Sequence, residues 1–296
     1  MKKIMTFIHG FCMALADSVP GVSGGTVAFL MGFYDDFVNS LDNIVSGTKE
    51  ERKKAVLYLI NLGIGWVLSF GLAVILLASM FEAHIYSVSS LFMGFIIFAI
   101  PVVIMEEKQC LKEKWKLFFF VLIGAAVVIL ISYLNPVGGG SSLDLSNPNF
   151  LTYIYIFFAG AIAICAMVLP GISGSTLLLI FGLYLPIITG IKDFLHFDFH
   201  AFPILVAFGL GIVTGIITTI KLIKNALQKF RGGMIYLIIG LMLGSIYSII
   251  VGPATLDNPQ PPMTMETFSF VWFLLGGVVI AAMQLLKNFA EKKQNS

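Results

Sequence analysis

Charged residues are scarce in this sequence. Asp, Glu, Lys and Arg make up 11% of its 296 residues, whereas a soluble globular domain carries about 25%. Hydrophobic residues make up 58% of the chain, and they gather in long runs that contain no charge. Water cannot be the main solvent of such a chain, so we expect an integral membrane protein.

Cysteine is also rare, and the three cysteines do not stand at the spacings of a disulfide framework or a metal site. The apolar runs contain no His–Asp pair, no acidic cluster and no arginine, which a catalytic phosphate site would need. We therefore expect no metal, no cofactor, no catalytic residue and no enzymatic activity. A nucleic-acid partner is not expected either.

A helix needs about 20 apolar residues to cross the hydrocarbon core of a bilayer. Two shorter runs, at 4–19 and 21–34, come first, and no signal-peptide cleavage site follows them. We therefore expect the N-terminal segment to be part of the fold. The runs that are long enough to cross lie at approximately 55–80, 85–105, 117–134, 150–169, 171–190, 201–220, 233–252 and 268–286.

The positive charges are distributed unevenly among the loops between these runs. All but one of the 18 Lys and Arg residues fall in alternate loops, and the exception is Lys192. Because Lys and Arg stay on the cytoplasmic side of short loops, both termini are predicted to be cytoplasmic.

Two stretches that lie 150 residues apart share one pattern, and Gly10 and Gly160 match at the same spacing upstream. This agreement indicates an internal duplication. The first copy is Pro20-Gly21-Val22-Ser23-Gly24-Gly25-Thr26, followed by Gly32-Phe33-Tyr34, and the second is Pro170-Gly171-Ile172-Ser173-Gly174-Ser175-Thr176, followed by Gly182-Leu183-Tyr184.

Three expected spans follow each copy, and the two runs around each copy add an even number of crossings. Each half therefore crosses the membrane an odd number of times, so the second half is inverted relative to the first. Inverted repeats are a common architecture of secondary transporters. We predict an all-α membrane protein of two inverted-topology repeats, each a Pro/Gly-broken, re-entrant helical hairpin followed by three transmembrane helices, with the two hairpin tips meeting near the middle. The units are a first repeat at 1–134 with its hairpin at 4–34, an extracytoplasmic linker at 135–149, and a second repeat at 150–296 with its hairpin at 150–190.

The repeated motif breaks one helix and begins another. Proline lacks an N–H and disfavours a helical residue before it, and the first N–H groups of the next helix have no partner inside that helix. With glycines for close approach and hydroxyls as donors, the motif predicts an anion cradle. The expected substrate-binding residues are Asp17, Ser18, Pro20, Gly21, Ser23, Gly24, Gly25 and Thr26 with Pro170, Gly171, Ser173, Gly174, Ser175 and Thr176.

Two alternatives stay open at these positions. Small residues also let membrane helices pack closely without binding any ligand. Asp17 is the one acidic residue well inside an apolar run, and such carboxylates default to a functional hypothesis. It is a candidate proton carrier, or else it accepts hydrogen bonds from N–H groups after the break; Met167 stands at the equivalent position of the second copy.

The run from Gly10 to Tyr34, together with the second motif copy, resembles the bacterial polyprenyl-phosphate transporter (PopT-like) family, formerly a family of unknown function. The resemblance covers essentially the whole chain. It implies a multi-pass protein of the bacterial plasma membrane. It also implies a flippase that returns undecaprenyl phosphate from the outer to the inner leaflet for cell-wall and other envelope polymers, with the phosphate at the paired half-helix N-termini.

Polyprenyl phosphate and membrane lipids are thus the expected partners, with protons or another ion as a coupling candidate. A second hypothesis is a secondary transporter of a small anion that uses the same broken helices. A difficulty for both is that no Lys or Arg lies deep in a span, because a buried phosphate is costly without a balancing cation.

Overall fold

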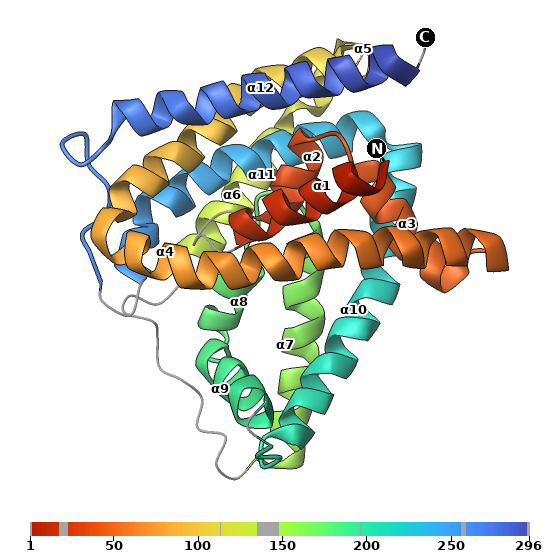
Figure 1. Cartoon of the computed structure of the whole chain (residues 1–296), viewed down its shortest axis with the longest axis vertical. Helices are drawn as coiled ribbons and strands as arrows, with labels where there is room; N and C mark the ends of the chain where they lie inside the picture. The colour runs from red at the N-terminus through yellow and green to blue at the C-terminus, as the bar shows by residue number, and fades with distance from the viewer. Residues whose placement is uncertain are drawn as a thin grey trace.

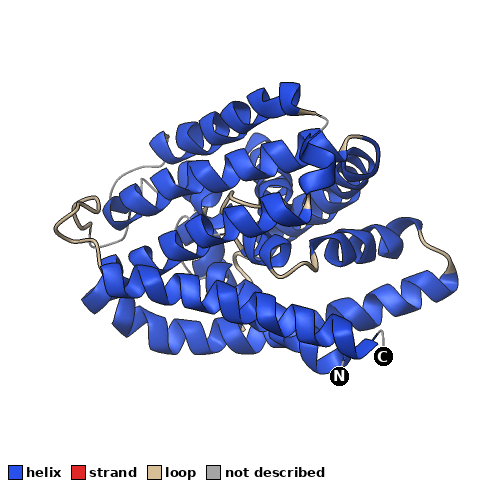
Figure 2. Cartoon of the chain, turned by 90° about the horizontal axis from the view of Figure 1, so that it is seen from above, coloured by secondary structure: helices blue, strands red, loops and turns tan. Residues whose placement is uncertain are grey.

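The computed structural model describes residues 2–17, 23–112, 114–134, 148–195, 197–255 and 259–294, and every regular element in these ranges is helical (Figures 1 and 2). The prediction of an all-α protein is confirmed. The first half contains α1 (Lys2–Asp17), α2 (Gly24–Leu30), α3 (Tyr34–Ser46), α4 (Lys49–Glu106), α5 (Lys108–Lys112), η1 (Trp115–Phe118) and α6 (Phe119–Tyr133). The second half contains α7 (Phe150–Val168), α8 (Gly174–Ile180), α9 (Tyr184–Leu195), α10 (Phe202–Lys229), α11 (Arg231–Val251), η3 (Gly252–Thr255) and α12 (Phe270–Gln294).

Five helices within the described ranges are long and apolar enough to cross a membrane. They match five of the spans expected from hydropathy, and a shorter apolar helix, Phe270–Ala282, matches a sixth. The chain is therefore a multi-pass membrane protein. The five helices are His84–Glu106, Trp115–Tyr133, Phe150–Val168, Phe202–Lys229 and Arg231–Ala254.

Helix α4 consists of two arms that meet at His84, whose backbone is not helical (φ −138°, ψ 34°). The arms correspond to the separate spans expected at 55–80 and 85–105. At the start of α4, a Thr48–Glu51 capping box satisfies N–H groups of the first turn. Hydrogen bonds donated by the Thr48 N–H and hydroxyl hold the pKa of Glu51 below its usual range.

Helices α2 and α8 each end after seven residues, for the same reason. Gly32 and Gly182 follow them with φ of 73° and 66°, a left-handed conformation that stops a helix. The N–H three residues beyond each helix then donates to a carbonyl of its last turn, as in Phe33 N to Ala28 O at 3.0 Å. The apolar run at 171–190 is therefore divided between α8 and α9, although it is long enough to cross a membrane as one helix, and the run at 21–34 ends at the start of α3 in the same way.

The main helix contacts occur in two matching sets. α1 packs on the first arm of α4 as α7 packs on α10, and α12 packs on the second arm of α4 as α6 packs on α11. A Cβ built on Gly65 would lie 2.1 Å from Phe7 O, and one on Gly211 would lie 2.1 Å from Phe157 O. These matched close approaches support the inverted repeat, which stays a prediction together with its unit boundaries.

The start of α1 and the end of α12 lie side by side in Figure 2 and toward the same edge of the molecule in Figure 1. The cytoplasmic location of both termini stays a prediction. The segment 135–147, which covers most of the expected linker, lies outside the described residues.

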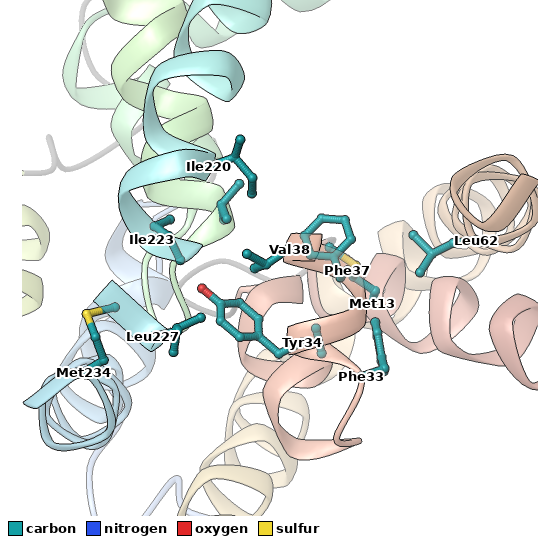
Figure 3. Packing of buried hydrophobic residues seen from close by; sticks show 12 residues of the cluster. Met13, Phe33, Tyr34, Phe37, Val38, Leu62, Ile220, Ile223, Leu227 and Met234 are labelled. Carbon is teal, nitrogen blue, oxygen red and sulfur yellow. The ribbon is translucent and has the colours of Figure 1, made fainter. Parts of the chain in front are cut away.

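Helix α3 joins the two halves through a buried apolar cluster (Figure 3). Tyr34 and Val38 of α3 are 2% and 1% exposed, and they lie between α1 on one side and Ile223 and Leu227 of α10 on the other. Inside a bilayer the surrounding lipid is as apolar as these side chains, so close van der Waals packing stabilises the contact rather than removal from water. The cluster holds the first hairpin against the second half.

Candidate functional site

The second motif copy forms a sharp turn between α7 and α8. α7 ends at Val168, as expected for a helix that precedes Pro170, and Leu169 is already extended (φ −79°, ψ 132°). Gly171 has a φ of +92°, and a Cβ there would lie 2.6 Å from the backbone of Leu241 in α11. Only glycine fits both the backbone angle and the space at this position.

The first motif copy places Ser23 at the N-cap of α2, with extended backbone (φ −122°, ψ 135°). The Ser23 hydroxyl accepts a hydrogen bond from Gly25 N at 3.1 Å. Of the sequence-predicted site residues, Ser18, Pro20 and Gly21 lie outside the described residues, and so does the side chain of Ser175.

The structure brings the two motif copies into direct contact. The Thr26 hydroxyl accepts a hydrogen bond from Gly171 N at 2.7 Å, and the Ser23 hydroxyl donates to Leu169 O at 3.4 Å. A Cβ on Gly25 would lie 3.1 Å from the Met167 and Val168 carbonyl oxygens. The two motif copies therefore meet, as expected, and we call this contact the tip interface. The re-entrant form of the two hairpins stays a prediction.

The tip interface is closed in this structure. Ser23 and Thr26 are 1% and 3% exposed, and Ser173 and Thr176 are each 8% exposed. The N–H groups of Gly24, Gly25 and Gly171 all donate to protein side chains. These amides are therefore not free donors in this structure, because polar side chains of the first hairpin accept from them. For Gly24 the acceptor is Asp17, which is one of the two roles that the sequence left open for this residue.

Asp17 accepts two hydrogen bonds. Its Oδ1 accepts from Gly24 N at 2.6 Å, and its Oδ2 accepts from the indole N–H of Trp66 in α4 at 3.0 Å. Of the two roles that the sequence left open for Asp17, these bonds match the acceptance of hydrogen bonds from N–H groups after the break, which braces the tip. The role of proton carrier stays a proposal. Sequence reasoning missed Trp66, although an indole N–H inside an apolar span needs an acceptor and was a usable signal.

His9 lies on α1, within the same hairpin. Its ring stacks on Phe33, with centroids 4.2 Å apart and planes 6° from parallel. In this structure it therefore acts as a packing residue.

A group of charged residues adjoins the turn between α2 and α3. Arg231 of α11 donates to Glu107 from Nε at 2.9 Å and to Asp35 from Nη1 at 3.1 Å, and Lys224 of α10 lies 2.6 Å from Asp42. We call these five residues the charged cluster. It connects α3 and the end of α4 to the second half.

Arg231 and Asp35 also line a cavity of about 190 Å³ with Gly32 and Tyr34. This places a cation beside the turn that ends the first hairpin, whereas the sequence could only suggest some cation at a hairpin mouth. The partners of Arg231 could not be found from sequence, because Asp35 is 196 positions away.

Comparison with known proteins adds an independent line of evidence. Residues 13–267 match a family described as undecaprenyl phosphate translocase-like. The chain is 30% identical to a polyprenyl-phosphate transporter of Vibrio cholerae serotype O1, over 99% of this chain and 98% of the relative. It is 33% identical to a polyprenyl-phosphate transporter of Staphylococcus aureus, over 94% of each chain.

No solved structure matches the chain. The family match and both relatives nevertheless extend over nearly the whole sequence, including both motif copies. The chain therefore belongs to the undecaprenyl phosphate translocase-like family.

Proposed function

We propose that this protein is a flippase of the bacterial plasma membrane that returns undecaprenyl phosphate from the outer to the inner leaflet, where the lipid carries precursors of envelope polymers. The observation that carries the proposal is the tip interface, where two copies of one polar motif meet in the buried centre of an apolar protein. The relatives, which are named polyprenyl-phosphate transporters, support this choice of substrate.

The tip interface has the groups that a phosphate needs. Hydroxyls of Ser23, Thr26, Ser173 and Thr176 and amides of the motif glycines are hydrogen-bond donors, and backbone glycine allows close approach. Helices α2 and α8 have only seven residues each, so we assign the main role to these donors rather than to helix dipoles.

Opening of the tip interface breaks few polar contacts. It breaks the Gly171–Thr26 and Ser23–Leu169 hydrogen bonds, and a typical protein hydrogen bond contributes about 1 kcal/mol net. Hydrogen bonds to a charged phosphate are roughly twice as strong as neutral ones. A phosphate that replaces the tip-to-tip bonds would therefore offset the cost of separating the hairpins.

In this scheme the closed tip interface is the barrier between the two sides of the membrane. Alternate separation of the hairpins would expose the head-group site to one leaflet and then to the other, while the prenyl chain stays among helices and lipid. Asp17 is the proposed proton carrier, and Arg231 at the turn after α2 is the proposed counter-charge for the arriving phosphate.

The test is transport of labelled undecaprenyl phosphate in proteoliposomes, with the label added to either leaflet. Replacing Ser23 and Ser173 together by Ala should abolish transport, because each hairpin then loses a hydroxyl donor. Ser245→Ala is the matched control: Ser245 is 1% exposed, and its hydroxyl donates to the Met242 carbonyl of its own helix.

Unchanged transport in the double variant would contradict the proposed site. Transport of inorganic phosphate by the wild-type protein, with no movement of the prenyl lipid, would instead favour the small-anion hypothesis. The same double variant expressed in cells that depend on the protein should also change surface exposure of the carrier lipid.

A further inference from the structure

An apolar cavity of about 250 Å³ lies beside the first hairpin. It is enclosed by α1, α2, the second arm of α4 and α12, so both halves of the chain contribute to it. Its lining is entirely apolar and includes Cys12, Ala16, Val27, Phe92, Trp272 and Val279.

Two residues that line the cavity are direct sequence neighbours of residues at the tip interface. Ala16 precedes Asp17, and Val27 follows Thr26. Within α2, Gly25 and Thr26 contact the end of α7 and the second turn, whereas Val27 and Leu30, three residues apart on one helix face, line the cavity. A molecule held at the tip interface would thus have an apolar space beside an adjoining face of the same two-turn helix.

The cavity is also accessible from the side. Val279 of α12 lines it and is 40% exposed. Leu15, Leu91 and Trp272 are only partly buried. A chain could therefore enter between α12 and its neighbours without crossing a polar surface.

We propose that this cavity binds the isoprene units next to the phosphate of the transported lipid. This inference rests on the proposed function, because the phosphate anchors the chain at the tip interface. Lipid tails are as apolar as the cavity, so shape and van der Waals contact must distinguish the bound chain. A branched prenyl chain with its methyl groups should therefore be preferred over a straight alkyl chain.

The proposal is tested with two neighbouring valines of α12. Val279→Trp fills the cavity, whereas Val278, which is 63% exposed, does not line it, and Val278→Trp is the matched control. Transport of undecaprenyl phosphate would be measured in vesicles of phosphatidylethanolamine and phosphatidylglycerol, with dodecyl phosphate as the straight-chain comparison.

We expect Val279→Trp to lower undecaprenyl phosphate transport about tenfold, which corresponds to the loss of roughly two buried methylene groups. Val278→Trp should behave as wild type, and dodecyl phosphate should be the poorer substrate of the wild-type protein. Equal transport by the two variants would overturn the cavity proposal alone. A wild-type protein that moves no prenyl phosphate would overturn the proposed function as well.

A second measurement does not depend on a bulky substitution. With Cys110 and Cys165 replaced by Ser, Cys12 is the one remaining thiol and reports on the cavity. Undecaprenyl phosphate should slow the reaction of Cys12 with a lipid-soluble maleimide about tenfold, whereas inorganic phosphate should leave it unchanged. Equal reaction rates with and without the prenyl lipid would overturn the proposal.

Discussion

The two hairpins share a backbone but differ in chemistry. Each has a glycine directly under the side chain seven positions earlier: Gly24 lies against Asp17, and Gly174 lies against Met167. Each short helix ends at a left-handed glycine. The repeated small residues therefore determine the geometry of both tips. The side chain that packs on the glycine differs, because it is Asp17 in the first hairpin and Met167 in the second.

The difference extends to a second residue. In the first half, Trp66 follows Gly65 and donates to Asp17. The matched glycine of the second half is Gly211, and it is followed by Ile212. The carboxylate and its indole donor are thus both present in the first half and both replaced in the second, which agrees with their direct pairing.

The largest expected effect comes from making the first hairpin resemble the second. Asp17→Met removes the acceptor for Gly24 N and for the Trp66 indole, and each buried donor without an acceptor costs about 1–3 kcal/mol. Trp66→Phe in the same chain should recover part of the loss, with a coupling of about 1–2 kcal/mol. Thermal unfolding in detergent measures the double-mutant cycle, and strictly additive effects would show that the two residues do not act as a pair.

A second substitution separates the two roles of Asp17. Asp17→Asn keeps one oxygen that can accept a hydrogen bond from Gly24 N, but its amide does not take up and release a proton as a carboxylate does. If Asp17 transports protons, the variant should bind prenyl phosphate and lose the pH dependence of transport. A variant that keeps the wild-type pH profile would restrict Asp17 to bracing the tip.

The glycines beneath these side chains should respond differently. A Cβ on Gly24 would lie 2.5 Å from Asp17 Oδ2, while one on Gly174 would lie 2.3 Å from Met167 Cγ. Methionine is flexible and can move aside, whereas the Asp17 carboxylate is held by two hydrogen bonds. We expect Gly24→Ala to cost about 1–3 kcal/mol and Gly174→Ala about 1 kcal/mol, measured by unfolding; the reverse order would contradict this account of the tips.

The smallest effect is expected at the helices that follow the hairpins. Asp35 and Asp42 connect α3 to the second half by ion pairs, whereas the matching positions of α9 are Leu185 and Lys192. Arg231 is 37% exposed, so Arg231→Gln should lower stability by only about 1 kcal/mol. The loss should shrink at high salt, and a salt-independent loss would show that the side chain acts through packing instead.

Much of the fold was predictable from sequence, because its signals are local. Hydropathy identified the spans, and Pro170 marked the end of α7, since it restricts the residue before it. The turns after α2 and α8 were missed because a glycine in an apolar run looks the same in a continuous helix and at a left-handed helix end. The motif residues were found by their repetition, but the pairing of Asp17 with Trp66 was not.

The sequence by itself determined that the chain is a membrane protein, that it repeats a polar motif, and that helices break at each copy of the motif. These features depend on the hydrophobicity of a segment or on short-range sterics, which are properties of neighbouring residues. Only the tertiary structure decided which groups meet. The Gly171 N–H donates to Thr26, the Trp66 indole donates to Asp17, and Arg231 donates to Asp35. The apolar cavity beside α2 likewise forms only when the helices pack. These partners lie between 49 and 196 positions apart in the chain, so helix packing alone brings them within hydrogen-bond distance.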